Sequence, residues 1–350
     1  MKILYAGTLS TGNSAAYRMW ALRRLGHTVI PFETGGYEST NKLLKKIEFR
    51  LSVGKGVRRL NADLLSLARA ERPDVFWSDK LLKLRPETLD AMRGLGIVSV
   101  SYMIDNAFGP RRDPGWRLYV QDIPHFDLHV TQRDVSVRDY RERGARDVMK
   151  VQTAYEPTIH FPPPAGWSDA DRDREVSFVG TPYDNRAGVL ERLGQEGIPV
   201  TISGRRTAWV KALSGPMMDK IFYSDLLYEK AYREAIWKSK INISFLTRSN
   251  LDEYTHKSFE IAGCGGFLLV ERCPGHLERF VEDAEAVFFD GYDELKAKIL
   301  EWLPDEAGRA RIAAAGQARA LKDGYHNDRQ VERIMERVEQ IAAANQGMSA

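Results

Sequence analysis

The sequence predicts an α/β protein built from two Rossmann-like domains. Short apolar strands alternate with helices in the first half, beginning with Ile3–Ala6, a helix over Ala15–Leu25 and a strand over Thr28–Phe32. Such alternation is typical of a parallel sheet with helical crossovers. A second alternating series begins at Glu175–Val179, after the three consecutive prolines Pro162–Pro164. The prolines indicate a stiff, extended linker, so we expect a domain boundary there.

The bulk composition narrows the class of protein. A chain of 350 residues with 43% hydrophobic and 28% charged residues is long enough for two globular domains. The formal charge of +3 gives no reason to expect a nucleic-acid partner. We find no signal peptide and no apolar run of the roughly 18 residues that a membrane span needs. The only cysteines, Cys264 and Cys273, have no cluster of His nearby. We therefore expect a cytoplasmic protein with free thiols and no metal.

One local charge imbalance lies in the first half. Residues 42–59 contain seven basic side chains and one acidic side chain, Glu48. The run predicts either a solvated helix face or a surface that docks on an anionic acceptor or a membrane. The basic residues are Lys42, Lys45, Lys46, Arg50, Lys55, Arg58 and Arg59.

Strands and helices continue to alternate in the rest of the first half, and one of these strands is followed by polar residues. The strand Ile97–Met103 runs into Asp105 and Asn106. Ligands of open α/β sheets collect outside the carboxyl ends of strands, which makes Asp105 a candidate base or acceptor-binding group. Asp-Asn pairs also form ordinary turns and helix caps. The further elements predicted here are strands over 75–77, 128–131 and 148–151 and helices over 87–93 and 135–143.

In the second half, two strands end in residues suited to an anionic ligand. The strand Glu175–Val179 leads into Gly180, Thr181 and, at the start of a helix, Arg186. Backbone amides at a helix start attract phosphate and an Arg adds charge, although a solvated Arg explains the residue equally. The strand over 200–203 ends in Gly204 and Arg205. The other predicted elements are helices over 229–238, 293–303, 306–321 and 326–344 and strands over 241–245 and 286–289.

The stretch Thr255–Glu271 is the most informative in the chain. Lys257–Ala262 predicts a short helix, which glycines at 263, 265 and 266 stop before the apolar strand Phe267–Val270. Such glycines also let a ligand approach the backbone. Lys257 offers a cation for an anionic ligand and Glu260 offers a carboxylate for hydroxyls. The alternative is an ordinary α/β turn.

This stretch resembles the C-terminal half of GT-B glycosyltransferases, most closely the bacterial group named after the spore-maturation protein CgeB. The resemblance rests on a basic residue followed by Phe259-Glu260, a run of small residues, Cys264-Gly-Gly266 and an apolar strand. The group usually has Arg where Lys257 stands, and Lys lacks the bidentate fork of Arg. A family acidic residue eight positions before Glu260 corresponds to Asp252.

The resemblance implies a GT-B fold, with two Rossmann-like domains, an interdomain cleft and a C-terminal crossover helix. The expected division is an acceptor-side domain over 1–157, a linker over 158–174, a nucleotide-sugar-binding domain over 175–324 and a returning helix over 325–350. Expected donor-site residues are Gly180, Thr181, Arg186, Gly204, Arg205, Arg248, Thr255, His256, Lys257, Glu260 and Gly265; Gly12, Asn13, Asp105 and Asn106 are expected on the acceptor side, with Asp105 and Lys257 catalytic. A plain tight turn explains Gly12 and Asn13 equally, and a surface position explains His256.

The resemblance also implies the activity. We expect a metal-independent glycosyltransferase that moves a hexosyl or related group from a nucleotide-diphosphate sugar, most often a UDP-sugar, to a hydroxyl acceptor, with no other cofactor. The acceptor class (glycan, protein or small molecule) and the oligomeric state stay open. Two alternatives also stay open: a GT-B-like sugar-nucleotide epimerase, and a non-catalytic protein that binds a sugar nucleotide.

Overall fold

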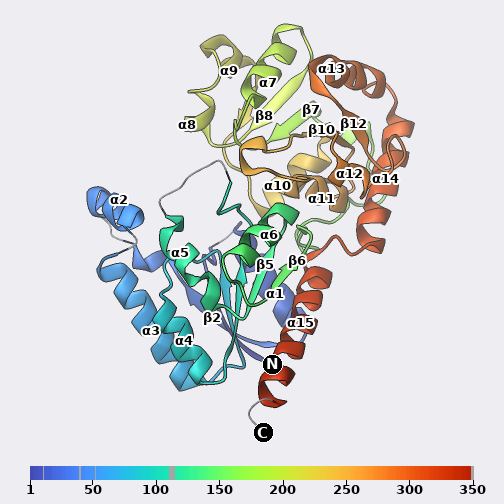
Figure 1. The fold of residues 1–350 in the computed structure, drawn as a ribbon. Coiled ribbons are helices and arrows are strands. Elements are labelled where there is room, and N and C mark those ends of the chain that lie inside the picture. The colour runs from blue at the N-terminus through green and yellow to red at the C-terminus, as the bar shows by residue number, and fades with distance from the viewer. Residues whose placement is uncertain (11, 39–40, 52, 110–114, 348–350) are drawn as a thin grey trace. The chain divides into compact units, whose positions relative to one another are not determined.

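The computed structural model describes all residues except 11, 39–40, 52, 110–114 and 348–350, and leaves the side chains of residues 42, 45, 46 and 49 undescribed. The chain forms two compact units (Figure 1). Unit 1 is Met1–Gln152 with Asn327–Ala350, and unit 2 is Thr153–His326. No helix in the described ranges is long and apolar enough to cross a membrane.

Unit 1 contains a six-stranded sheet in the order β2-β1-β3-β4-β5-β6, in which every described strand pair is parallel. The strands are β1 Lys2–Gly7, β2 Thr28–Glu33, β3 Val75–Asp79, β4 Val98–Tyr102, β5 Leu128–Thr131 and β6 Val148–Lys150. The helices are α1 Ser14–Arg24, α2 Lys42–Leu51, α3 Lys55–Glu71, α4 Pro86–Gly94, α5 Trp116–Asp122, α6 Asp134–Glu142 and α15 Asn327–Gly347.

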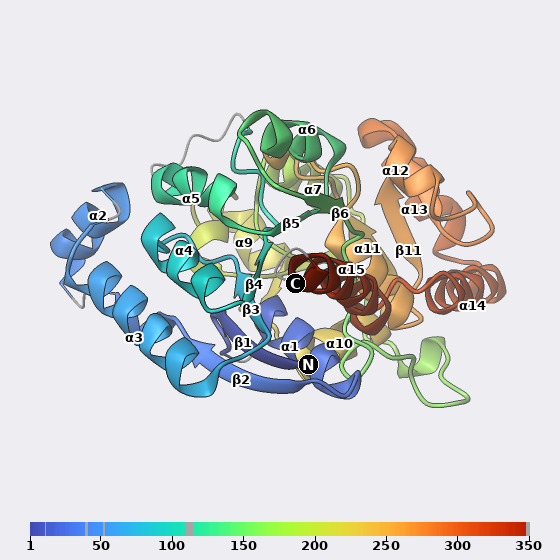
Figure 2. The same cartoon turned by 60° about the horizontal axis from the view of Figure 1, so that its bottom comes forward.

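Helices cover both faces of this sheet. Alternate residues of β1 point to opposite faces, as the period of a strand requires. Ile3 and Tyr5 pack with residues of α1 and α15, whereas Leu4 and Ala6 pack with residues of α3 and α4. Figure 2 shows these two helix layers on either side of the strands. Both faces are therefore buried, which explains why the strand sequences are apolar throughout.

Unit 2 contains a second six-stranded parallel sheet in the order β12-β11-β10-β7-β8-β9. Its strands are β7 Arg174–Val179, β8 Val200–Ser203, β9 Phe222–Ser224, β10 Ser239–Ser244, β11 Leu268–Glu271 and β12 Val287–Phe289. Its helices are α7 Arg186–Gln195, α8 Arg206–Trp209, α9 Gly215–Ile221, α10 Glu229–Trp237, α11 His256–Gly263, α12 Pro274–Leu277, α13 Gly291–Trp302 and α14 Glu306–Lys322.

The two faces of this sheet are also covered by different helices. Phe178 and Ile243 pack on the side of α7, α9 and α13, and Val270 and Phe288 pack on the side of α10 and α11. The second layer brings α11, the helix that carries Lys257 and Glu260, directly onto the sheet. The packing of α11 on the sheet therefore fixes the position of the helix that the sequence analysis found most informative.

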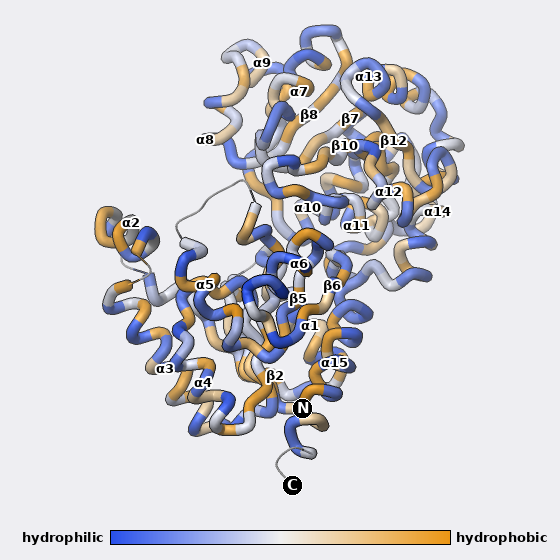
Figure 3. Tube along the Cα trace, viewed as in Figure 1, coloured by the Kyte–Doolittle hydropathy of each residue, from blue (hydrophilic) through white to orange (hydrophobic). Residues whose placement is uncertain are grey.

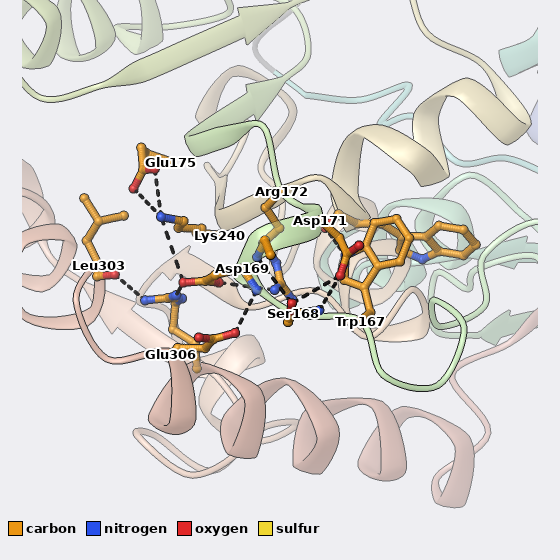
Figure 4. Close-up of polar contacts among 12 residues, drawn as sticks. Trp167, Ser168, Asp169, Asp171, Arg172, Glu175, Lys240, Leu303 and Glu306 are labelled. Carbon is orange, nitrogen blue, oxygen red and sulfur yellow. Dashed lines mark hydrogen bonds and ion pairs between the residues drawn. The ribbon is translucent and has the colours of Figure 1, made fainter.

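Part of the predicted linker is tied into unit 2. Figure 4 shows the segment around Asp169, whose backbone N–H donates to Glu306 Oε1 at 2.7 Å. Arg309 and Arg172 also bond the Asp169 carboxylate. The ring nitrogen of Trp167 donates to the carbonyl of Trp237 at 3.1 Å. In the structure, residues 158–174 therefore lie within unit 2, and the boundary between the units falls between Gln152 and Thr153.

The structure confirms the predicted alternation and the parallel direction of both sheets. It also contains four short helices and one strand that the sequence analysis did not predict: α5, α8, α9, α12 and β9. These elements are three to seven residues long, too short to show a hydrophobic period of their own. Helices α2 and α3 account for the basic run over residues 42–59.

Candidate functional site

The site is built around the start of α11. Thr255 caps this helix, because its Oγ1 accepts from the backbone N–H of Ser258 at 3.2 Å. The same hydroxyl bonds Ser244 at 2.8 Å, at the carboxyl end of β10. The backbone N–H of Thr255 donates to Nε2 of the buried His276 at 3.1 Å. These bonds hold the first turn of α11 at the edge of the sheet where ligands of α/β proteins collect.

Glu260 lies on α11 with only 8% of its surface exposed. The hydroxyl of Tyr232 donates to Oε2 at 2.8 Å, and Nε2 of His256 lies 3.0 Å from Oε1. Burial raises the pKa of this carboxyl, but the charges of His256, His160 and Lys257 and the bond from His256 outweigh burial and lower it below the ordinary value. Glu260 is therefore an ionised, oriented carboxylate. A carboxylate has about four lone-pair sites, so these two bonds leave acceptor capacity for a ligand.

Lys257, three residues earlier, has a different environment. Its ammonium nitrogen lies 4.9 Å from the centre of the Tyr232 ring, a cation–π contact. Within the described ranges it makes no hydrogen bond and no ion pair within 4.0 Å. Burial lowers its pKa, the Glu260 carboxylate opposes that shift and Arg186 adds to it, and the net direction is downward. Lys257 is thus a partly buried cation without a bonded anion.

Two glycines follow neighbouring strands and pack against each other, and the first of them lies next to Lys257. A Cβ on Gly180, after β7, would lie 3.5 Å from Cε of Lys257 and 2.7 Å from the Phe178 ring. A Cβ on Gly204, after β8, would lie 2.1 Å from the carbonyl oxygen of Gly180. The backbone turns after β7 and β8 therefore meet so closely that only glycine fits. Gly180 thus lies beside both Gly204 and Lys257.

Arg186 bonds its own unit rather than standing free. Its Nη2 donates to the carbonyls of Phe245 at 3.2 Å and Leu246 at 3.1 Å and to Thr247 Oγ1 at 2.8 Å. Its Nη1 donates to the carbonyl of Thr181 at 3.2 Å. Burial lowers its pKa. These bonds position the loop after β10, and Nε has no hydrogen-bond partner among the described residues.

The other two predicted arginines differ from each other. Arg248 is 72% exposed and forms an ion pair with Glu271, whose Oε2 also accepts from the backbone N–H of Leu246 at 2.9 Å. Arg205 is exposed at the start of α8. Asp252, the possible counterpart of a family acidic residue, accepts from the side-chain amide of Asn250 at 3.0 Å.

The glycines that stop α11 serve packing rather than ligand approach. A Cβ on Gly265, which has a φ of +64°, would lie 3.2 Å from Cβ of Pro162. A Cβ on Gly263 would lie 2.8 Å from the Tyr155 ring. Residues 153–163 therefore occupy the space beside the glycine stretch. The predicted approach of a nucleotide to Gly265 is at odds with this packing, because the chain itself fills that position.

Three residues of this site were missed by the sequence analysis: Thr153, His160 and Tyr232. Thr153 hydrogen-bonds Nδ1 of His256, which leaves Nε2 to donate to Glu260. His160 Nε2 lies 3.8 Å from Glu260, and burial lowers the His160 pKa. Because Thr153 and His160 are a hundred positions from Glu260, no local pattern points to them.

In unit 1, the predicted acceptor-side residues lie at the carboxyl ends of strands. Asp105, after β4, pairs with Lys80, after β3. Asn106 is buried and its Oδ1 accepts from the backbone N–H of Phe108 at 2.9 Å. Asn13 caps α1 by accepting from the N–H of Ala15 at 3.2 Å, and Gly12 has a φ of +76°. Gly12 and Asn13 thus act at least as the turn and cap that open α1.

A buried charge cluster in unit 1 was also missed. Arg18, from α1, donates to both oxygens of Asp79, at the end of β3, at 2.7 and 2.8 Å. The hydroxyl of Tyr5 donates to Asp79 Oδ2 at 2.6 Å. The Arg18 guanidinium lies 4.2 Å from the centre of the Tyr102 ring. The signal was present, since Asp79 follows an apolar strand just as Asp105 does.

Metal-ligating groups do not gather anywhere in the described ranges. No three His, Cys, Asp or Glu side chains there are placed to hold an ion together. Cys264 and Cys273 are free cysteines.

Comparison with known structures identifies the fold. The chain matches HepE of Anabaena, in complex with UDP and glucose, with a TM-score of 0.64 and 14% identity over 97% of this chain and 100% of that chain. The fold is GT-B. It matches sucrose-phosphate synthase of Thermosynechococcus elongatus with a TM-score of 0.65 and 10% identity, over 98% of this chain and 100% of that one. The α,α-trehalose-phosphate synthase (UDP-forming) of Burkholderia vietnamiensis matches with a TM-score of 0.65 and 14% identity, over 98% of each chain.

The sequence comparison is narrower. Residues 186–336 match a family model described as glycosyl transferase-like. This range contains α11 with Lys257 and Glu260. No curated protein matches the chain. The matches to solved structures confirm the predicted GT-B fold. The closer resemblance to the CgeB-like group stays a prediction.

Proposed function

We propose that the protein is a glycosyltransferase that moves a sugar from a nucleotide-diphosphate sugar to a hydroxyl acceptor. The glycosyl transferase-like match over residues 186–336 and the GT-B fold support this function. Similar structures hold UDP or UDP-glucose, which favours a UDP-sugar as donor.

The observation that carries the proposal is the pair of charges on the first turns of α11. Lys257 is a cation without an ionic partner in the described part of the chain, and Glu260 is an ionised carboxylate held by two donors. Both start from a helix whose first turn is bonded to the carboxyl end of β10. A cation and a carboxylate delivered together suit a ligand with a diphosphate at one end and vicinal hydroxyls at the other.

Each group has a role in the transfer. As the bond from sugar to diphosphate breaks, negative charge grows on the leaving phosphate. The Lys257 ammonium would stabilise that charge without any rearrangement, which is the most effective form of electrostatic catalysis. Glu260 would accept hydrogen bonds from the ribose hydroxyls.

On the acceptor side, we propose Asp105 as the group that takes the proton of the attacking hydroxyl, if the reaction inverts the sugar. Its carboxylate lies at the carboxyl end of β4 and pairs with Lys80. We also propose that the reaction needs no metal, because Lys257 supplies a positive charge for the diphosphate. Turnover that survives a chelator would agree with this, and turnover restored only by a divalent cation would contradict it.

Nucleotide release from a panel of UDP-, GDP- and dTDP-sugars, with and without candidate acceptors, tests the function. We expect UDP to be released from one donor in an acceptor-dependent way, and release to fall strongly in Lys257→Ala. Lys322→Ala, at an exposed position of α14, is the matched control and should keep full activity. An isomerised nucleotide sugar would instead indicate an epimerase, and binding without turnover would indicate a non-catalytic protein.

A further inference from the structure

Helix α2 exposes a continuous apolar stripe. Leu43, Ile47 and Leu51 stand four residues apart, so they lie on one face of the helix, and Leu44 lies beside them. Their surfaces are 67%, 44%, 51% and 52% exposed in the order Leu43, Ile47, Leu51, Leu44. Val53, after the helix, is 47% exposed. Figure 3 shows hydrophobic and hydrophilic residues interleaved along α2. Five large apolar side chains in one exposed segment indicate an interaction surface.

The same segment is strongly basic. Residues 42–59 contain seven Lys and Arg residues against Glu48 alone. Of these, Arg50, Lys55, Arg58 and Arg59 are exposed. Arg59 is fixed, since its guanidinium donates to the carbonyl of Gly36 at 2.9 Å. An apolar stripe on a basic helix is the composition that binds the interface of an anionic bilayer, where the apolar side chains enter the acyl boundary and the cations meet the headgroups.

An open cavity adjoins the end of the stripe. It has a volume of about 450 Å³, and its lining includes Leu51, Val53, Arg85, Glu87 and Arg117. Within the described ranges, the guanidinium groups of Arg85 and Arg117 make no hydrogen bond or ion pair. In the described part of the chain, two guanidinium groups without a partner thus lie beside apolar side chains, which matches the phosphate and upper acyl chain of an anionic lipid.

We propose that α2 and this cavity form a docking surface for an anionic lipid bilayer. The stripe would enter the membrane interface, the exposed side chains of Arg50, Lys55, Arg58 and Arg59 would lie at headgroup level, and Arg85 and Arg117 would bind a lipid phosphate. A second copy of the chain fits this surface less well, because the segment has a net positive charge and a two-fold contact would bring the like charges of the two copies together. The inference does not depend on the glycosyltransferase proposal.

Vesicle flotation of the full chain tests the proposal. The probes are vesicles of phosphatidylcholine alone and vesicles with added phosphatidylglycerol. We expect binding to the anionic vesicles only, weakened by salt, since the lipid charge is screened. The double variant Leu43→Gln/Ile47→Gln should bind on the order of tenfold more weakly or worse, because two apolar side chains leave the interface. The matched control is Leu300→Gln/Leu321→Gln, at leucines that are 53% and 59% exposed on α13 and α14, and it should bind as the wild type does.

The outcomes separate the alternatives. Absence of binding to anionic vesicles, or equal binding by the Leu43→Gln/Ile47→Gln variant, would overturn the proposal. So would a dimer in sedimentation velocity that this variant dissociates, because the stripe would then serve a second copy. Arg85→Gln/Arg117→Gln should lower the affinity for anionic vesicles severalfold, and unchanged affinity would remove the cavity from the docking surface. Circular dichroism of each variant shows that a loss of binding is not a loss of folding.

Discussion

The two units place charged residues at the same kind of position and use them differently. In unit 1, Arg18 and Asp79 meet at the carboxyl ends of strands, are 4% and 3% exposed and bond each other through both carboxylate oxygens. In unit 2, Lys257 and Glu260 share a helix at the carboxyl end of β10 but form no ion pair. The Glu260 oxygens bond Tyr232 and His256 instead.

This difference is the reason why we propose the cluster of unit 2, and not that of unit 1, as the binding site. A buried pair whose hydrogen-bonding groups satisfy each other has little left to offer a ligand and mainly specifies the local structure. A cation that is held beside a carboxylate without bonding it keeps its charge for a ligand. Both clusters lie at the ends of strands, so this position alone does not assign a function to a charged residue. The bonding partners of the residue distinguish the two cases.

The largest expected effect comes from removing one partner of the Arg18–Asp79 pair. Arg18→Leu leaves Asp79 buried with Tyr5 as its remaining donor, and removing one partner of a buried pair costs about 3–5 kcal/mol. Urea denaturation measures the loss. The double variant Arg18→Met/Asp79→Leu, which removes both charges, should recover most of it. A loss below about 1 kcal/mol for Arg18→Leu would show that the pair is not structural.

The second largest effect is expected for the substitution of Lys257. Lys257→Ala should lower turnover about 100-fold, the effect of removing one group that stabilises charge in a transition state. Donor affinity should fall less than turnover, because the charge on the phosphate grows during the reaction. Steady-state kinetics and equilibrium binding on the same preparation measure both. Equal losses in the two quantities would mean that Lys257 only binds the donor.

The substitution of Glu260 should have a smaller effect. Glu260→Ala removes hydrogen bonds to a diol and should weaken donor binding by about 1–3 kcal/mol. Titration with UDP and with its 2′-deoxy form measures whether the lost energy belongs to the ribose. The wild type should prefer UDP, and the variant should not. A preference that persists in the variant would remove Glu260 from the ribose site.

A third carboxyl extends the comparison, because no described residue gives it a cation or a hydrogen-bond donor. Asp122, at the end of α5, is 0% exposed, and within the described ranges both of its oxygens lack a hydrogen-bond partner. Burial, with a contribution from Glu87, raises its pKa from 3.8 to about 9. Its pKa is higher in the folded state, so its contribution to stability is complete below the unfolded pKa and is lost as pH rises toward the folded value.

Asp122→Asn mimics the protonated acid and should remove that loss. The melting temperature of the variant should exceed that of the wild type slightly at pH 5 and by more at pH 8. Thermal unfolding at the two pH values measures the difference. A gain that does not grow with pH would show that Asp122 is not protonated in the folded protein.

The fold was predictable because its signals are local. The strands β1 and β7 are continuous apolar runs, and buried parallel strands produce such runs wherever they occur. The short elements α8, α9 and β9 were not predictable, because segments of three to seven residues take their conformation from tertiary packing.

The site was predictable only in part. Lys257 and Glu260 are one helical turn apart, so their proximity follows from the sequence. The partners of Glu260 come from Tyr232 on α10 and His160 in the expected linker, and long-range contacts of this kind leave no local pattern. Arg186 shows the opposite difficulty. Its position after a strand suggested a phosphate ligand, but only its bonds to the Phe245 and Leu246 carbonyls reveal a positioning role.

Calorimetric titration of UDP and UMP into the wild type, Lys257→Gln and Glu260→Gln tests the central claim most directly. If α11 binds the two ends of a ribosyl diphosphate, Lys257→Gln should lose affinity for UDP more than for UMP, because the β-phosphate is the group that differs. Glu260→Gln should weaken both nucleotides by the same factor, because both carry the ribose. UDP affinity that is unchanged in both variants would contradict the assignment of the nucleotide to α11.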